Sequence, residues 1–194
     1  MRGEQEMAQT EIEERFDNSF TEKFGFPKGR AANKVVESLR ESHIAFIKEA
    51  PFMVMATSDS SGKCDASPKG GLPGFVKVLD ENTLLLPDVA GNKLFQSYQN
   101  IQTNPHIGLI FFIPGLNETL RVNGNAEVIS DETVVDLKLQ LEVSNPDEKA
   151  KILQGVLVDV EEAYGHCPRA FSFSSLWDID QINRNKGGTA KLND

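Results

Sequence analysis

A series of short apolar runs, separated by polar or Pro/Gly turns, occupies residues 52–128 and constrains the fold more than any other feature. Residues 52–56, 63–67, 75–79, 83–86 and 107–113 have the length of strands, and 120–128 alternates apolar with polar residues, as a half-buried strand does. Turn residues stand between them at 59–62, 80–82 and 114–117. About seven short strands at this spacing, with helices only at edges and corners, predict a closed antiparallel β-barrel.

Outside these runs, the patterns favour a few peripheral helices. An apolar stripe beginning near Ala31 predicts a helix that ends before Pro51. Asn92 is expected to cap a helix with Leu94, Phe95, Tyr98 and Ile101 on one face. Residues 68–74 hold two Pro and three Gly, so we expect no regular strand there. A further helix is predicted from residue 130 to about 141, a last strand at 156–160 and a short helix at 167–171.

Length and composition predict one domain with polar ends. We divide the 194 residues into an arm (1–29), a barrel domain (30–180) and a loose tail (181–194). The formal net charge of −9 argues against nucleic acid or an anionic membrane as partner. The N-terminus has no apolar signal-peptide run, and no stretch nears the ~18 apolar residues of a membrane span. The cytoplasm is therefore the expected compartment.

Motifs for metal, hydrolytic or nucleotide chemistry are missing from the sequence. His43, His106 and His166 show no metal-ligand spacing, and the two cysteines form no C-x-x-C pair, so no metal site is predicted. The chain has no G-x-S-x-G, no P-loop and no G-x-G-x-x-G. We therefore assign no catalytic residue.

Several cations stand where strands end. Lys69 lies in the Pro/Gly segment, Lys93 follows Gly91 and Asn92, Arg121 lies on the alternating strand, and Arg169 follows Pro168. In a barrel, adjacent strand ends can bring such residues to one phosphate, and a helix starting at Asn92 would add N–H groups. For any one of these cations, a solvated surface position is the ordinary alternative.

The order of these segments resembles the pyridoxamine 5′-phosphate oxidase-like family of flavin-binding split barrels. The matching segments are residues 52–58, 65–70, 74–80, 84–88, 91–92, 100–111, 118–126, and 165–171 with 176–177. The resemblance spans residues 30–178, and 100–111 is its most family-like stretch. It implies a mainly β fold with peripheral helices: a six-stranded antiparallel split barrel, forming a homodimer with FMN at the interface.

The resemblance also implies which residues contact the flavin. Lys69 would bind the phosphate, and the adjacent Ser67 and Pro68 would line the same part of the site. Gly91, Asn92 and Lys93 would also face the phosphate. Leu86, Pro87 and Asp88 would flank the isoalloxazine, Arg121 would approach it from the next strand, and Arg169 and Trp177 would come from the partner subunit. The implied cofactor contacts are Thr57, Ser67, Pro68, Lys69, Leu86, Pro87, Asp88, Asn92, Lys93, Arg121, Arg169 and Trp177.

Departures from the family pattern bear on the charge of the expected phosphate site and on the expected substrate. Leu94, Phe173 and Ser175 stand where basic residues are expected in the subgroup, so the phosphate cage is thinner in positive charge. The vitamin oxidase's Arg-rich C-terminal substrate signature is absent, so the chain is not expected to be the vitamin oxidase itself.

The sequence thus favours a cytoplasmic FMN-binding oxidoreductase acting on a small molecule, with the flavin supplying the redox chemistry. One alternative is a non-catalytic split barrel that binds haem, a deazaflavin or a nucleotide in a sensing role, with a histidine as the haem ligand. Another is an interaction protein that has kept only a vestigial pocket.

Overall fold

The computed structural model describes residues 16–89, 91, 93–136, 143 and 151–188. Contacts divide the chain into two compact units, Met1–Val36 and Glu37–Asp194. The first unit contains the helix α2 (Ser19–Phe24) and the 3-10 turn η1 (Gly29–Ala31). The side chain of Asn18 caps α2 by accepting hydrogen bonds from the N–H groups of Phe20 and Thr21.

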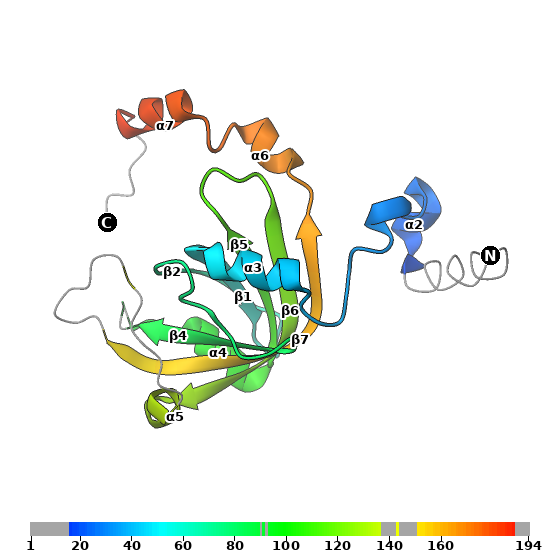
Figure 1. Ribbon diagram of the computed structural model, residues 1–194. Coiled ribbons are helices and arrows are strands. Elements are labelled where there is room, and N and C mark those ends of the chain that lie inside the picture. The colour runs from blue at the N-terminus through cyan, green and yellow to red at the C-terminus, as the bar shows by residue number, and fades with distance from the viewer. Residues whose placement is uncertain (1–15, 90, 92, 137–142, 144–150, 189–194) are drawn as a thin grey trace. The chain divides into compact units, whose positions relative to one another are not determined.

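The second unit is built on one antiparallel sheet with the strand order β2-β1-β5-β6-β7-β4-β3 (Figure 1). The strands are β1 (Phe52–Ser58), β2 (Cys64–Gly70), β3 (Lys77–Val78), β4 (Thr83–Val89), β5 (His106–Phe112), β6 (Thr119–Ser130) and β7 (Ile152–His166). The prediction of an antiparallel split barrel is confirmed, with seven strands in place of six. β2 stands at one end of the strand order and pairs only with β1, while β4 lies near the other end between β7 and β3. β2 and β4 are therefore not hydrogen-bonded neighbours.

The helices of this unit are α3 (Glu41–Glu49), α4 (Gln96–Thr103), α5 (Asp131–Asp136), α6 (Arg169–Ser174) and α7 (Ile179–Lys186). The helix predicted from Ala31 begins only at Glu41. The helix predicted from Asn92 begins at Gln96, where Phe95 occupies the N-cap position with a left-handed φ of 48°. The prediction of an Asn92 cap for α4 is therefore wrong, and Asn92 itself lies outside the described residues. The first residues of the tail predicted to be loose are helical, as part of α7.

Alternation along the strands creates the core. Met53 and Met55 on β1, Phe111 on β5 and Val122 on β6 are fully buried, while the residues between them face outward. Each such side chain contributes about 1.5–3 kcal/mol when it leaves water. The period-two pattern of the sequence thus decides which face of the sheet is the inner one.

The two longest strands curl the sheet. β6 pairs with β5 over its first half and with β7 along its whole length, and the first half of β7 also pairs with β4 on its other edge. A β-bulge interrupts the β6–β7 register at Asn123/Gly124, and a Cβ at Gly124 would overlap the carbonyl oxygen of Asp159. Glycine is therefore required where the strands approach most closely.

The segment with Pro68 differs from its prediction. Residues 68–70 complete β2, although a regular strand was not expected there. Proline lacks the N–H that a central strand must donate, but β2 is an edge strand and pairs only with β1. Strand geometry is thus compatible with this Pro/Gly sequence.

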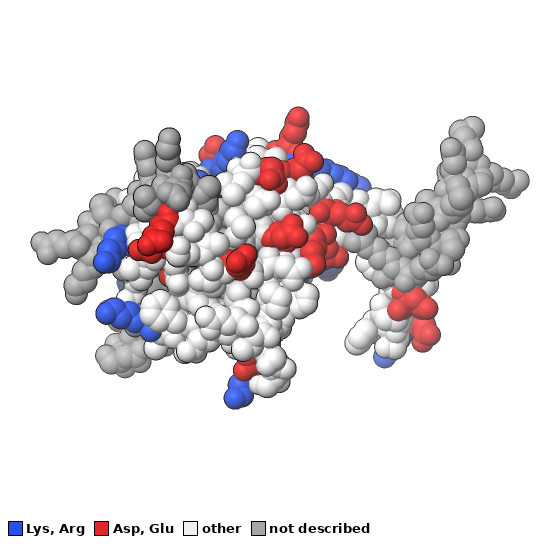
Figure 2. Space-filling view, turned by 90° about the horizontal axis from the view of Figure 1, so that it is seen from below, with Lys and Arg blue, Asp and Glu red and all other residues white. Residues whose placement is uncertain are grey.

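On the face shown in Figure 2, Asp and Glu side chains are spread over the described surface, with Lys and Arg between them and at its edges. None of the described helices combines the length and the apolar character that a membrane crossing needs.

Candidate functional site

A cavity of about 260 Å³ opens where β2, β4 and α4 converge. It lies at the split of the barrel, because β2 and β4 approach one another here without pairing. Its lining residues are Asp65, Ala66, Ser67, Pro68, Lys69, Asp88, Val89, Gly91, Lys93, Leu94, Phe95, Gln96, Ser97, Tyr98 and Leu153. Asp65, Ser67 and Lys69 occupy the half-buried positions of β2, so this edge strand presents polar groups to the cavity.

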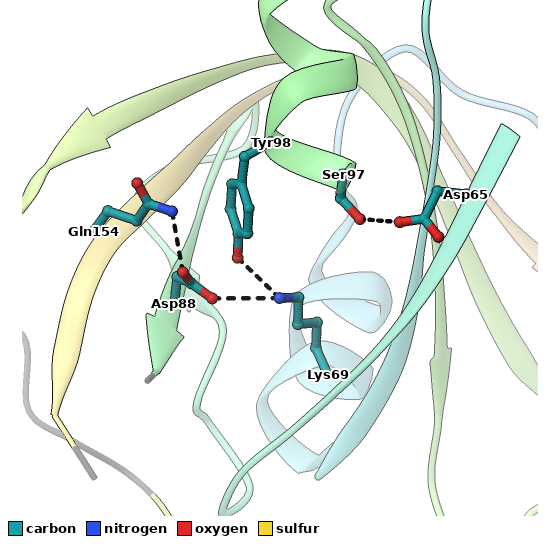
Figure 3. A network of polar contacts seen from close by, with 6 residues as sticks. All are labelled: Asp65, Lys69, Asp88, Ser97, Tyr98 and Gln154. Carbon is teal, nitrogen blue, oxygen red and sulfur yellow. Dashed lines mark hydrogen bonds and ion pairs between the residues drawn. The ribbon is translucent and has the colours of Figure 1, made fainter. Parts of the chain in front are cut away.

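Lys69 is at the centre of a polar network (Figure 3). Its ammonium lies 3.3 Å from the Asp88 Oδ1 atom and donates a 2.8 Å hydrogen bond to the Tyr98 hydroxyl. Nζ also lies 5.0 Å from the centroid of the Tyr98 ring. Three elements, β2, β4 and α4, are joined through this one side chain.

Asp88 is a buried carboxylate, with 6% of its surface exposed. It follows Leu84 and Leu86 along the inner side of β4, and its register partner on β7 is Gln154. The Gln154 amide donates a 3.1 Å hydrogen bond to Oδ2, so each carboxylate oxygen has a partner. Such pairing offsets the cost of burying a charge.

The Tyr98 hydroxyl stays protonated. Burial is the main cause that raises the pKa of Tyr98, and hydrogen bonding to Asp88 together with the Asp88 charge raises this pKa further. Tyr98 therefore offers a neutral hydroxyl group to the cavity.

Hydrogen bonds hold α4 against the barrel. The buried Ser97 hydroxyl donates a short bond to the Asp65 carboxylate on β2. Asn100 donates to the Thr57 hydroxyl at 3.0 Å, and Asn104 donates to the Ser58 hydroxyl at 3.0 Å, both on β1. The helix wall of the cavity is thus fixed at both ends.

The backbone on the α4 side of the cavity adopts unusual angles. Lys93 (φ 62°) and Phe95 (φ 48°) both have left-handed conformations. For residues other than glycine this costs about 1–3 kcal/mol and is found mostly at ligand sites and switches. The strained backbone of Lys93 and Phe95 thus lies in the wall of the cavity, and Lys93 is one of the two lysines of the lining.

The formal charges of the described lining cancel. Lys69 and Lys93 contribute two positive charges, and Asp65 and Asp88 contribute two negative ones. The site is therefore polar without the strong positive field that a cage of cations alone would create.

A second hollow, a groove of about 570 Å³, lies on β1, β2, β5 and β6. Thr57, His106 and Cys64 line it, together with Ala56, Ser58, Asp65, Ala66, Ile107, Gly108, Asn123, Gly124 and Glu161. His106 is exposed at its edge. No group of His, Cys, Asp and Glu suited to a metal ion occurs among the described residues.

The structure brings together five of the twelve implied cofactor contacts and separates others. Ser67, Pro68, Lys69, Asp88 and Lys93 line the cavity. The remaining predicted residues that are described lie elsewhere: Thr57 in the groove, Leu86 and Pro87 along β4, Arg121 on β6 between Ile110 and Tyr164, and Arg169 and Trp177 in the C-terminal segment.

Four participants in the network were absent from the predicted cofactor contacts: Asp65, Ser97, Tyr98 and Gln154. Tyr98 was assigned to an apolar helix face, where a buried hydroxyl group that needs a partner was the available signal. Ser97 precedes it on the same helix. Gln154 carries no motif, and only its pairing with Asp88 reveals its role.

A family model for pyridoxamine 5′-phosphate oxidase matches residues 39–164, which is more than half of the chain and includes β1 to most of β7. The chain belongs to the pyridoxamine 5′-phosphate oxidase family. All five predicted residues that line the cavity lie within the matched region of this family. Comparison with curated proteins gives no match.

Solved structures similar to this chain include the following three. A proposed pyridoxamine 5′-phosphate oxidase from Lactobacillus delbrueckii is 24% identical, with a TM-score of 0.50, and the match covers 68% of this chain and 98% of that one. A HupZ variant from Group A Streptococcus is 17% identical (TM-score 0.47; 66% and 98% covered). A second proposed oxidase, from Corynebacterium glutamicum, is 18% identical (TM-score 0.44; 68% and 95% covered). At 24% identity the likeness to the Lactobacillus delbrueckii structure concerns the fold alone.

Proposed function

We propose that this chain binds FMN, with the phosphate in the cavity at the split of the barrel, and acts as an FMN-dependent oxidoreductase on a small molecule. The observation that carries the proposal is the convergence of Lys69 and Lys93 on one cavity in a chain of this family. Lys69 comes from β2 and Lys93 from the segment before α4, so charged hydrogen-bond donors can approach one anionic group from two sides.

The residues present fit a phosphate monoester. The Lys69 ammonium has three N–H donors, and its contacts with Asp88 and Tyr98 use two of them, so the third can be donated to an anion. Lys93 supplies a second charge, and Ser67 and Gln96 supply neutral donors. Leu94, Phe95 and Leu153 add apolar surface for an aromatic ring system.

When bound, FMN supplies the redox chemistry of its ring system. The side chains of this protein bind and orient the ligand. Lys69 anchors its anionic group, Tyr98 keeps the ammonium in place with a hydroxyl that stays protonated, and α4 closes one wall against water.

We also propose that the active form is a homodimer. Four aromatic rings form a row in which each ring contacts the next, with neighbouring centroids 5.8–6.0 Å apart: Phe52, Phe112, Phe171 and Trp177. This row continues into a C-terminal segment with exposed apolar side chains, of which Phe173 is 74% and Ile179 is 64% exposed. A second copy would bury this surface, and Arg169 and Trp177 could then reach the site of the partner. Light scattering at several concentrations tests this, and a strictly monomeric protein would contradict it.

The visible spectrum tests the FMN proposal directly. A flavin band near ~450 nm is expected after incubation with FMN and removal of the free ligand. Lys69→Met should weaken FMN binding about 10- to 100-fold, because a charged donor is lost and Asp88 remains uncompensated. Lys48→Met makes the same charge change on the exposed side of α3 and should leave FMN affinity unchanged. Absence of a flavin band with excess FMN would refute the proposal.

One observation favours a second candidate function. Exposed His106 lines the wide groove, so the groove presents an imidazole to a ligand, as haem binding requires. The alternative is a non-catalytic sensor that binds haem, a deazaflavin or a nucleotide. A Soret band on adding haem that is lost in His106→Ala, together with no flavin binding, would support this alternative.

A further inference from the structure

The cavity holds a buried carboxylate beside its principal cation. Asp88 Oδ1 lies 3.3 Å from the Lys69 ammonium, while 7% of the Asp88 side chain and 23% of the Lys69 side chain are exposed. An anion that enters the cavity to reach Lys69 must therefore approach Asp88 as well. At such distances like charges repel strongly, because water screens them poorly in a partly buried site.

Asp88 is also fixed in place. It is a strand residue at an inner position of β4, its register partner is Gln154, and the Gln154 amide holds the oxygen that does not face Lys69. Turning away from Lys69 would break both contacts, and the buried carboxylate would lose its cation and its amide donor. Asp88 thus competes permanently with any anion for the same ammonium.

We propose that Asp88 is a specificity-determining residue, whose carboxylate compensates Lys69 and thereby lowers the preference of the cavity for a phosphorylated ligand over its unphosphorylated form. The inference rests on the proposed function in that the cavity is the phosphate site. A phosphate monoester carries a charge of about −1.5 to −2 at neutral pH. The Asp88 carboxylate therefore repels the phosphate of FMN, whereas riboflavin has no phosphate to repel.

The test compares FMN with riboflavin in three proteins: wild type, Asp88→Asn and Asp159→Asn. The readout is the ratio of the riboflavin Kd to the FMN Kd, measured by flavin fluorescence. Asp88→Asn keeps the shape of the side chain and an acceptor for Lys69, and the ratio should rise about 10- to 100-fold. Asp159→Asn makes the same charge change at an exposed position of β7 and should leave the ratio unchanged. An unchanged or smaller ratio in Asp88→Asn would overturn the inference.

A second probe separates this inference from the proposed function. Inorganic phosphate, titrated against each protein and followed by 31P NMR, should bind Asp88→Asn more tightly than wild type. If phosphate does so while neither flavin binds, the FMN proposal fails and the role of Asp88 stands. If phosphate binds the variant no more tightly, the role of Asp88 is refuted whatever the flavins do. Asp88→Ser, which also removes the carboxylate, should change the affinity in the same direction and guards against an effect peculiar to the amide.

Discussion

Replacing Lys69 with methionine tests whether the ion pair at the split of the barrel also stabilises the fold. The substitution keeps an unbranched side chain but removes the ammonium that lies 3.3 Å from the Asp88 carboxylate. Removing one partner of a fully buried pair costs about 3–5 kcal/mol. Losing an exposed pair costs about 0.2–1 kcal/mol. Since 23% of the Lys69 side chain is exposed and 7% of that of Asp88, we expect the free energy of unfolding to fall by about 2 kcal/mol.

Urea unfolding, followed by circular dichroism and by fluorescence of the single tryptophan, Trp177, measures this change. For a domain of this size the loss corresponds to a decrease in Tm of about 4–8 °C. Lys69→Met/Asp88→Asn should recover most of the lost stability, because the carboxylate left without its cation is then neutralised. Lys48→Met, on the exposed side of α3, should change the free energy of unfolding by less than about 0.5 kcal/mol.

Two results would refute this reasoning. If Lys69→Met is as stable as wild type, the ion pair does not contribute to folding. If the double variant is no more stable than Lys69→Met, the loss arises from packing or from the Tyr98 contact and not from an uncompensated charge.

Three further predictions concern the frame around the site. Gly124→Ala should lower the free energy of unfolding by about 3 kcal/mol or more, because its Cβ would overlap a main-chain oxygen of β7, whereas Gly165→Ala, with open space around it, should be nearly neutral in the same urea experiment. The Ser61 hydroxyl and the main-chain N–H of Lys63 lower the pKa of Asp59 in the β1–β2 turn. The ionised Asp59 carboxylate therefore stabilises the fold at pH values above its ordinary pKa of 3.8, and this stabilisation is lost as the pH falls through the lowered pKa. Asp59→Ala should be less stable than wild type at neutral pH, and acid denaturation profiles should show this difference shrinking. Ser97→Ala should cost about 1–3 kcal/mol and weaken FMN binding by loosening α4, and an unchanged FMN Kd would show that this helix wall does not depend on the bond to β2.

Local patterns predicted much of the barrel. Alternation placed Val122 and Ala126 on one face of β6, and both are buried in the structure. The segment around Lys69 was singled out because a cation stood among turn-forming residues, and this lysine does line the cavity. The rule that a Pro/Gly segment is not a regular strand failed for Pro68, because a sequence does not reveal that a strand lies at the edge of a sheet.

The amino-acid sequence by itself determined most of the strands, their inward faces and the presence of a lysine in the Pro/Gly segment after residue 67, since these depend on neighbours two to four positions away. The tertiary structure decided that this lysine meets Asp88, and that Asp88 meets Gln154 across 66 residues of sequence. The physical reason is the curl of the sheet. Long β6 and β7 carry β4 round toward β2 without pairing them, and the charges of the two strands then compensate one another inside the split.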